Sequence, residues 1–274
     1  MIFSRVETPR DVVESSVGGP RLIDTHAHLQ WPNFKNDREQ VIERAFAAGL
    51  TTIVNIGYDL NASREAVQIA NDHSNVYAVI GIHPHSAKTI RTDVLASLRE
   101  LARTPNVVAI GEIGLDYFRD LSPRQRQVEA FEQQLQLARE LQLPVVIHDR
   151  EAHSDVLQMM RKFGKEVSGV LHCFSGSIEM AEEAVKLGYM ISIAGPVTFP
   201  NARKLHQVVE HLPTESIVLE TDCPWLTPQS KRGKRNEPAF ILETAHKVAD
   251  LKGIQVTELA EITSRNARRL FRIE

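Results

Sequence analysis

Short apolar runs alternate with longer amphipathic stretches along the chain from Leu22 onwards. The apolar runs are four or five residues long and rich in β-branched side chains, which is typical of strands that are buried on both faces. We therefore expect strands at Leu22–Thr25, Thr51–Asn55, Val76–Ile80, Val107–Ile110, Val145–His148, Gly169–His172, Met190–Ile193 and Ile217–Glu220.

The stretches between these runs have helical periodicity. They predict helices at Asp37–Ala48, Ala62–Asp72, Val94–Arg103, Pro123–Leu141, Ser154–Phe163 and Glu179–Leu187. In the longest of them, Val128, Phe131, Leu135 and Ala138 recur at intervals of three and four residues, so they form one stripe that faces the strands.

Two further signals mark helix ends. Ser122 and Pro123 predict a helix start, with the serine as N-cap and the proline in the first turn. The tail from Pro238 predicts two helices joined near Gly253, the last of which covers the barrel through Leu259, Ile262, Leu270 and Phe271.

The alternation of strands and helices predicts an α/β fold, specifically a TIM (β/α)₈ barrel with an extra C-terminal helix, in one domain over residues 21–274. A doubly wound open sheet is the competing architecture. It would scatter the ends of the strands along an edge, whereas a barrel gathers them around one opening. Residues 1–20 form a polar N-terminal extension, which we expect to be flexible and to end at Gly18-Gly19-Pro20.

Residues of the types that bind metals stand at the ends of five predicted strands. His26 and His28 are two apart, so they share one face of the first strand. A metal centre at the C-terminal face of a barrel has this layout, and the six predicted ligands are His26, His28, Glu112, His148, His172 and Asp222.

This donor set predicts hydrolysis. Imidazole with carboxylate suits Zn²⁺, Mn²⁺ or Fe²⁺, whereas Mg²⁺ prefers more oxygen. Glu112 has two oxygens that can bridge two cations, which would polarise a substrate and activate a water. We expect Glu112 and Asp222 to be catalytic, with Asp222 accepting the proton of that water. Asp116 is expected to support the metal ligands without binding metal itself. Glu220 could be a buried support on the same strand face as Asp222, but the sequence does not determine its role.

The formal net charge of −3 weighs against a nucleic-acid binder that relies on overall charge alone, but not against an enzyme with a local basic patch. The two cysteines, Cys173 and Cys223, are expected to be small buried residues without a disulfide. A chain of this kind, with no apolar run long enough to span a bilayer, is expected to be cytoplasmic and to make no membrane contact.

Basic residues after the last strand point to a phosphate-containing substrate. Lys231-Arg232-Gly233-Lys234-Arg235 is either a solvated loop or a phosphate clamp, and from its place beside Asp222 we expect Arg232 and Arg235 to bind substrate. His83 is also expected to contact substrate, with a further metal-ligand role as the alternative. Trp225 either stacks a base or packs as a plug.

Taken together, these residues resemble the TatD family of metal-dependent deoxyribonucleases. The resemblance runs from about Leu22 to Phe271. It rests on Ile23-Asp24-Thr25-His26-Ala27-His28-Leu29, Gly81-Ile82-His83-Pro84-His85, Ile110-Gly111-Glu112-Ile113-Gly114-Leu115-Asp116-Tyr117, Leu143-Pro144-Val145-Val146-Ile147-His148, Leu171-His172-Cys173-Phe174-Ser175-Gly176, Glu220-Thr221-Asp222-Cys223-Pro224-Trp225-Leu226, Arg232-Gly233-Lys234-Arg235-Asn236-Glu237-Pro238 and Asn266-Ala267-Arg268-Arg269-Leu270-Phe271.

The resemblance implies a centre with two divalent metal ions (Zn, Mn, Mg or Fe) and 3′–5′ exonuclease activity on DNA, expected on single strands. It assigns His26, His28, Glu112 and Asp222 to one cation and Glu112, His148 and His172 to the other. We expect a monomer whose partner is its substrate, DNA or RNA. Departures such as Ala27 and Asp149 fall outside the predicted ligands.

Two other functions remain open from the sequence. The same centre could hydrolyse a small amide, lactone or phosphoester, in which case the basic loop would contribute little. The third hypothesis is a non-enzymatic scaffold. It is disfavoured because all six predicted ligand positions hold residues that can bind a metal.

Overall fold

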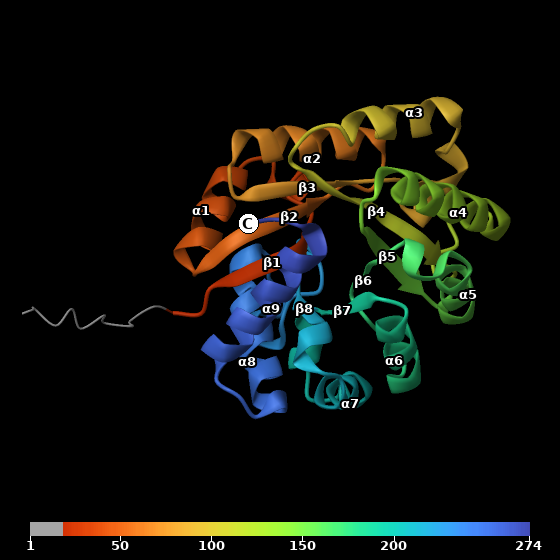
Figure 1. The fold of residues 1–274 in the computed structure, drawn as a ribbon. Coiled ribbons are helices and arrows are strands. Elements are labelled where there is room, and N and C mark those ends of the chain that lie inside the picture. Colours follow the sequence, from red (N-terminus) through yellow and green to blue (C-terminus); the bar gives the residue numbers. More distant parts are fainter. Residues whose placement is uncertain (1–18) are drawn as a thin grey trace, which may run out of the picture.

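Eight parallel strands form one sheet in the computed structural model, which describes residues 19–274 (Figure 1). Each strand pairs with the next in the sequence, from β1 to β8. The sheet closes where a bridge between Ala27 and Cys223 joins β1 to the segment after β8. The strands are β1 Leu22–Ala27, β2 Leu50–Ile56, β3 Val76–Ile80, β4 Val107–Asp116, β5 Val145–Arg150, β6 Gly169–Leu171, β7 Tyr189–Ile193 and β8 Ile217–Leu219.

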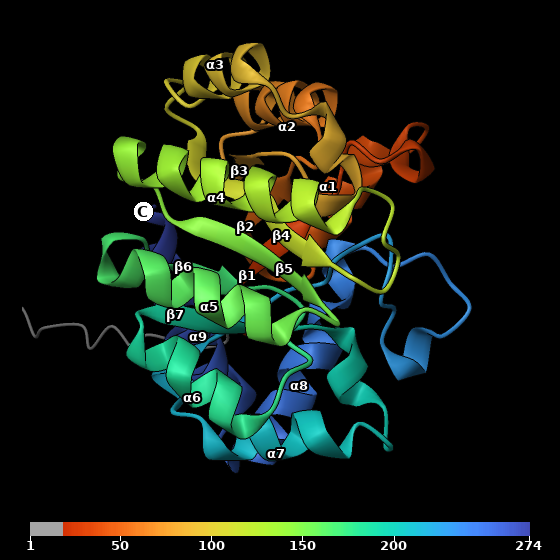
Figure 2. The same ribbon diagram turned by 90° about the vertical axis from the view of Figure 1, so that its right-hand side faces the viewer.

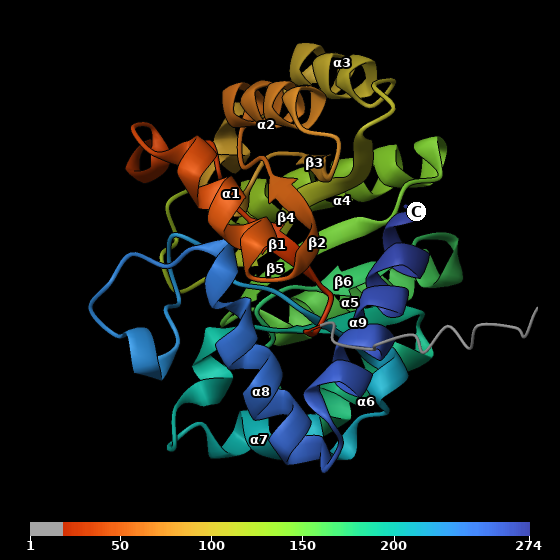
Figure 3. The same cartoon turned by 90° about the vertical axis from the view of Figure 1, so that its left-hand side faces the viewer.

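Helices surround these strands (Figures 1 and 3). They are α1 Arg38–Ala47, α2 Leu60–Asp72, α3 Thr92–Leu101, α4 Arg124–Leu141, α5 His153–Phe163, α6 Ile178–Lys186, α7 Arg203–His211, α8 Ile241–Lys252 and α9 Val256–Phe271. Short 3₁₀ helices occur at η1 Pro32–Phe34, η2 Pro84–Thr89, η3 Gly164–Glu166, η4 Gly195–Thr198, η5 Thr214–Ser216, η6 Gln229–Lys231 and η7 Pro238–Phe240.

The barrel predicted from the sequence is confirmed, and every predicted strand is present. Most strand ends agree to within two residues, but β4 continues six residues beyond the predicted end at Ile110. Its pairing with β5 slips between Ile110 and Ile113 and then resumes as far as Asp116. All ten residues of β4 are buried, but Gly111 and Glu112 interrupt the apolar run after Ile110, so the apolar pattern predicted too early an end for this strand.

Two clusters of buried side chains hold the barrel together. The smaller one contains Ile23, Val54 and Val218 from the strands, and Leu270 and Phe271 of α9 pack within it. The predicted covering of the barrel by the last helix is therefore correct for these two residues. Of the other two residues predicted to take part, Leu259 packs in the larger cluster and Ile262 is only partly buried.

The predicted role of Ser122 as N-cap is wrong. Pro123 occupies the N-cap of α4, and no side chain caps that helix. The Ser122 hydroxyl instead donates to the carbonyl of His85 at 2.8 Å, so it fixes the loop after β3 rather than the helix start.

Within residues 19–274, no helix combines the length and apolar character needed to cross a membrane. The predicted flexible extension over residues 1–20 lies outside the described residues, apart from Gly19 and Pro20.

Candidate metal centre

Closure of the barrel brings Asp222 to the first strand. The Asp222 N–H donates to the His26 carbonyl at 2.8 Å, and the His28 N–H donates to the Cys223 carbonyl at 3.0 Å. Asp222 has a φ of 54°, a left-handed conformation that is uncommon outside glycine. The backbone therefore positions the Asp222 carboxylate opposite the two histidines of β1.

Four of the predicted ligands form a first group of donor atoms. The Nε2 atoms of His26 and His28 lie 3.0 Å apart. Oδ1 of Asp222 is 3.6 Å from the first of these nitrogens and 3.5 Å from the second. Oε2 of Glu112 is 3.5 and 3.7 Å from the same two atoms. All four side chains are largely buried.

The second carboxylate oxygen of Glu112 belongs to another group. Oε1 of Glu112 lies 2.7 Å from Nδ1 of His148 and 2.9 Å from Nε2 of His172. Those two nitrogens are 3.2 Å apart. Glu112 thus stands between two clusters of donors, with one oxygen in each.

The outer nitrogens of two imidazoles face hydrogen-bond acceptors, and that of a third lies near a carboxylate without a hydrogen bond. Nδ1 of His28 lies 2.9 Å from the Ile56 carbonyl, which can only accept, so this nitrogen carries the proton. Nε2 of His148 lies 3.2 Å from an Asp116 oxygen. Nδ1 of His172 lies 3.3 Å from Glu220. In each ring the nitrogen that faces inward is then free to bind a cation, which is the usual arrangement of metal-binding histidines.

The spacing of these donors fits a divalent cation. Ligands at about 2.0–2.2 Å in a tetrahedral site lie roughly 3.4 Å from one another. The first group, His26, His28, Glu112 and Asp222, spans 3.0–3.7 Å. These two imidazole nitrogens and two carboxylate oxygens therefore form a set of donors that one divalent cation could share.

Crowding around Gly111 places Glu112 in this position. A Cβ at Gly111 would lie 2.7 Å from Cβ of Val146, so only glycine allows β4 to approach β5 this closely. The Glu112 N–H donates to the Gly57 carbonyl at 2.9 Å.

The electrostatics keep both carboxylates ionised. Burial acts to raise the pKa of Glu112, but the surrounding imidazoles, led by His172, hold it well below the ordinary value. Burial likewise opposes ionisation of Asp222, yet its contact with His28 and the nearby imidazoles lower its pKa. Both groups therefore offer charged oxygens at neutral pH.

His83 lies beside Glu112, with Nε2 3.4 Å from Oε1. Its Nδ1 accepts a hydrogen bond from the His85 N–H at 3.1 Å, so the neutral ring carries its proton on Nε2. Burial lowers the pKa of His83 to about 4, which keeps the ring neutral at pH 7. His83, Glu112 and His148 are close enough to share an ion. However, a protonated Nε2 can donate a hydrogen bond but cannot bind a cation, which favours substrate contact.

Asp116 supports the centre from behind. Its Oδ2 faces Nε2 of His85 at 2.8 Å and Nε2 of His148 at 3.2 Å. Its Oδ1 accepts the N–H groups of Phe118 and Arg119 at 3.1 and 2.7 Å. Burial acts to raise the pKa of Asp116, and the hydrogen bonds from His148 and His85 reverse this and lower it.

Two buried glutamines of α4 hold the loops that carry these groups, and no role was predicted for either. Gln134 accepts from the Ile82 N–H at 2.7 Å and donates to the Ile82 carbonyl at 3.0 Å. Gln127 accepts from the Asp116 N–H at 2.9 Å. The one sequence signal that could have indicated their role is that these two amides stand seven residues apart, beside the apolar stripe of the helix.

Asp24 belongs to the first motif, Ile23–Leu29, and no role was predicted for it from the sequence. It is fully buried and accepts hydrogen bonds from the Thr221 N–H at 2.9 Å, the Thr221 hydroxyl at 2.6 Å and the His26 N–H at 3.1 Å. Burial raises its pKa to about 8. Asp24 therefore ties β1 to the residue before Asp222.

The basic loop, residues 231–235, projects on the side to which strands β4 and β5 point (Figure 2). The guanidinium of Arg235 is already occupied by contacts within the protein. It donates to both oxygens of Asp37 at 2.8 and 2.6 Å and to the Asn33 carbonyl at 2.6 Å. Its guanidinium also lies over the ring of Phe34 at 4.5 Å. Figure 3 shows this loop beside α1.

Arg232 and Lys234 differ from Arg235, because both are exposed and neither makes an ion pair within residues 19–274. Lys231 is partly engaged by Glu243 at 3.5 Å. The loop is closed at its base by Asn236, which donates to the carbonyls of Thr221 and Trp225. Arg232 is thus the arginine of this loop that is open to a phosphate.

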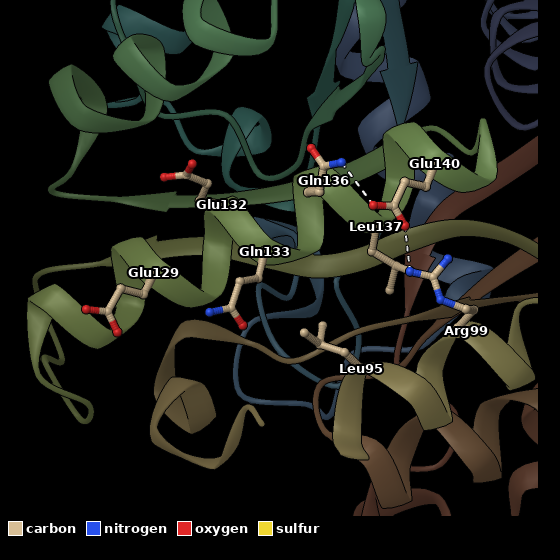
Figure 4. Close-up of a pocket in the computed structure, with 8 residues that line it drawn as sticks. All are labelled: Leu95, Arg99, Glu129, Glu132, Gln133, Gln136, Leu137 and Glu140. Atoms are coloured by element: carbon tan, nitrogen blue, oxygen red, sulfur yellow. Dashed lines mark hydrogen bonds and ion pairs between the residues drawn. The ribbon is translucent and has the colours of Figure 1, made fainter. Parts of the chain in front are cut away.

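A separate hollow lies between α3 and α4 on the outside of the barrel (Figure 4). It contains none of the predicted site residues. Its lining consists of Leu95, Arg99, Glu129, Glu132, Gln133, Gln136, Leu137 and Glu140. Glu140 is paired there with Arg99 at 2.5 Å and accepts from Gln136 at 2.9 Å, so these polar groups satisfy one another.

Comparison with known proteins adds an independent line of evidence. The model of the family described as TatD related DNase matches residues 23–272. A protein of Bacillus subtilis named uncharacterized metal-dependent hydrolase YabD is 45% identical over 253 residues, covering 92% of this chain and 99% of that protein. A protein of Erwinia amylovora named 3′-5′ ssDNA/RNA exonuclease TatD is 38% identical, covering 91% of this chain and 99% of that one.

Solved structures give the same picture. The crystal structure of YJJV, a TatD homologue from Escherichia coli, has a TM-score of 0.87 and 32% identity, covering 92% of this chain and 98% of that chain. The TatD family hydrolase from Entamoeba histolytica follows with a TM-score of 0.83 and 26% identity, covering 93% and 99% of the two chains.

Proposed function

The chain belongs to the family of TatD-related DNases, and from this we infer that it is a divalent-metal-dependent hydrolase of phosphodiester bonds in nucleic acid. The observation that carries the proposal is the convergence of six donor side chains, with three imidazoles turned so that a free nitrogen faces inward. The printed name of the Erwinia relative supports a 3′–5′ direction and a single-stranded substrate, DNA or RNA.

We propose that two cations are held here. His26, His28, Glu112 and Asp222 would bind one, and Glu112, His148 and His172 the other, with one Glu112 oxygen in each group. Divalent cations at such a centre lower the pKa of a water molecule and neutralise charge on a phosphodiester. The mixture of nitrogen and oxygen donors suits Zn²⁺ or Mn²⁺ better than Mg²⁺.

Asp222 is the proposed general base. Oδ1 faces His26 and His28, whereas Oδ2 makes no hydrogen bond within residues 19–274. The lowered pKa keeps the carboxylate ionised, so Oδ2 can accept the proton of the attacking water. Its side chain is 14% exposed, against 0% for His26 and 3% for His28, so substrate water can reach it.

His83 and Arg232 would position the substrate. The proton on Nε2 of His83 can be donated to a phosphate oxygen beside Glu112. Arg232 would pair with a phosphate further along the strand, because its guanidinium is free and can bind phosphate through two nitrogens. A substrate contact for Arg235, predicted from the sequence, stays a prediction, since its terminal nitrogens already bind Asp37.

Hydrolysis of bis(4-nitrophenyl) phosphate tests the reaction class without requiring any contact outside the centre. Turnover that depends on added Mn²⁺ or Zn²⁺ and is removed by EDTA is expected. A metal-loaded protein that leaves this diester intact, yet hydrolyses an amide or a lactone, would overturn the proposed function.

A further inference from the structure

We propose that Trp225 provides a stacking surface for an unpaired nucleobase beside the metal centre, an inference that rests on the proposed nuclease function. The occupant is the base of the nucleotide whose phosphate lies at the centre. Sequence reasoning left Trp225 open between a base platform and a packing plug, and the structure adds the surroundings that decide between them.

Four aromatic rings form a closed circuit at the edge of the site. The ring of His28 lies 5.2 Å from that of Trp225 and 5.8 Å from that of Tyr58. Trp31 completes the circuit at 4.7 Å from Trp225 and 4.9 Å from Tyr58. We call Trp31, Tyr58 and Trp225 the aromatic cluster. Its members follow β1, β2 and β8, so three loops have been brought to one ligand of the first donor group.

The orientation of the rings leaves room for a parallel partner. The ring of Trp225 meets those of His28 and Trp31 at 72° and 69°, which are T-shaped contacts. No stacked contact involves Trp225 within residues 19–274. Its exposure is 41%, which is high for a large apolar side chain beside a buried centre. An indole that served only as a plug would bury this surface.

The backbone of Trp225 is held in place relative to Asp222, the proposed general base. Its N–H donates to the Asp222 carbonyl at 3.0 Å, and its own carbonyl accepts from Asn236 at 2.5 Å. Asn236 is fully buried. A stacking surface held this firmly loses little conformational freedom when a base binds, and it keeps a constant distance from the centre.

The path that a bound nucleic-acid strand would take also agrees with stacking on Trp225. One sugar joins a base to its own phosphate, so a base on Trp225 places that phosphate towards His28. The exposed cations Arg232 and Lys234 lie on the same loop as Trp225 and can follow the next phosphates. Aromatic rings with a basic groove are the usual means of binding single strands, whose bases are free to stack. A base inside a duplex has both faces covered already.

The first test compares Trp225→Ala with Trp225→Phe on single-stranded oligonucleotides that end in a 3′ adenosine or in a 3′ abasic sugar. We expect Trp225→Ala to lower kcat/KM for the adenosine end about 5- to 150-fold, mainly through KM, as a stack of ~1–3 kcal/mol predicts. The abasic substrate should change less than about 2-fold, and Trp225→Phe should recover most of the loss. Leu121→Ala, which removes another exposed apolar side chain, is the matched control.

Equal losses on both substrates would overturn the proposal, because a ring that only supports His28 affects every substrate alike. Hydrolysis of bis(4-nitrophenyl) phosphate by the same variants separates this from a failure of the proposed function. If the unaltered protein cleaves neither the diester nor the oligonucleotide, the proposed function has failed, and binding alone decides whether a base stacks.

Intrinsic fluorescence measures that binding directly. The chain has two tryptophans, Trp31 and Trp225, and both lie in the aromatic cluster. A phosphorothioate-linked adenosine dinucleotide, which resists cleavage, should quench the emission in a saturable way. Its abasic counterpart should not. Equal quenching by the two, or none by either, would contradict stacking.

Discussion

Glu220 lies directly behind His172, with Oε1 of the carboxylate 3.3 Å from Nδ1 of the ring. The same oxygen accepts the Cys173 N–H at 2.7 Å, and Oε2 accepts the Ser192 hydroxyl at 2.6 Å. Glu220 is 1% exposed and therefore cannot turn away to water. Its negative charge lies beside Nδ1 of His172, while Nε2 of the same ring faces Glu112 at 2.9 Å. The sequence had left the role of Glu220 undetermined, and its place supports a role in holding the proton on Nδ1.

Replacing Glu220 by glutamine should weaken metal binding. The variant loses the negative charge that holds the proton on Nδ1 of His172, and partners of this kind typically change metal affinity about 10- to 100-fold. Competition with a fluorescent chelator would measure the affinity. Glu166→Gln, an exposed carboxylate on the outer surface, is the control. An affinity unchanged in Glu220→Gln would show that the contact with His172 has no such role.

Asp222→Asn and Glu112→Gln should abolish turnover while the fold remains intact. The first removes the proposed proton acceptor, and the second removes the charge placed between the two donor groups. We expect a loss of at least about 100-fold in kcat, since proton transfer by a positioned base contributes typically 10²–10⁴-fold. Circular dichroism gives the check on folding. Near-normal rates in either variant would exclude the assigned role.

Arg232→Ala and Arg235→Ala should have different effects. Arg232→Ala is expected to raise KM for oligonucleotides and to reduce the slope of log KM against log salt by roughly 1, because one phosphate contact is lost. Turnover of bis(4-nitrophenyl) phosphate should not change.

For Arg235→Ala we expect a lower unfolding temperature, since Asp37 and the ring of Phe34 lose their partner. Arg265→Ala removes an exposed arginine that makes no ion pair within residues 19–274, and it controls for the change in net charge. A loss of stability in Arg232→Ala with none in Arg235→Ala would reverse the two assignments.

Tyr189 gives a prediction for the dependence of stability on pH. Its hydroxyl is buried without a hydrogen-bond partner, and burial raises the pKa of the phenol above its ordinary value near 10. The unfolded chain therefore ionises first. The free energy of unfolding should fall as pH rises above about 10 and continue to fall until the higher folded-state pKa is reached.

Tyr189→Phe should remove this contribution and cost nothing at pH 7, because an unpaired buried hydroxyl is itself unfavourable by about 1–3 kcal/mol. Urea unfolding between pH 7 and pH 11 would measure both effects. Tyr117→Phe is a useful contrast, since that hydroxyl donates to Asp155 at 2.7 Å. A large loss of stability at pH 7 in Tyr189→Phe would reveal a partner for the hydroxyl.

The fold was predictable because strands such as Val76–Ile80 and Tyr189–Ile193 are buried along most of their length, and burial leaves a local pattern in the sequence. The gathering of His26, His28 and Asp222 also followed from their places at strand ends. Gln127 and Gln134 could not be recognised in this way, because they bond to loops, and helical periodicity carries no information about hydrogen bonds between a helix and a loop.

The aromatic cluster shows the same limit. Trp31, Tyr58 and Trp225 belong to loops that are far apart in the sequence, and only closure of the barrel brings them together. Arg235 was predicted to bind substrate because it stands in a basic run. Its partner Asp37 lies nearly two hundred residues earlier, so no local pattern could reveal the ion pair.

The most direct test of the central claim is a time course on a 5′-labelled single-stranded DNA oligonucleotide with Mn²⁺ or Mg²⁺, run beside an EDTA control. We predict a ladder of products that shortens from the 3′ end, is absent with EDTA and is absent in Asp222→Asn. An oligonucleotide that remains intact with protein shown to contain bound metal would contradict the nuclease assignment.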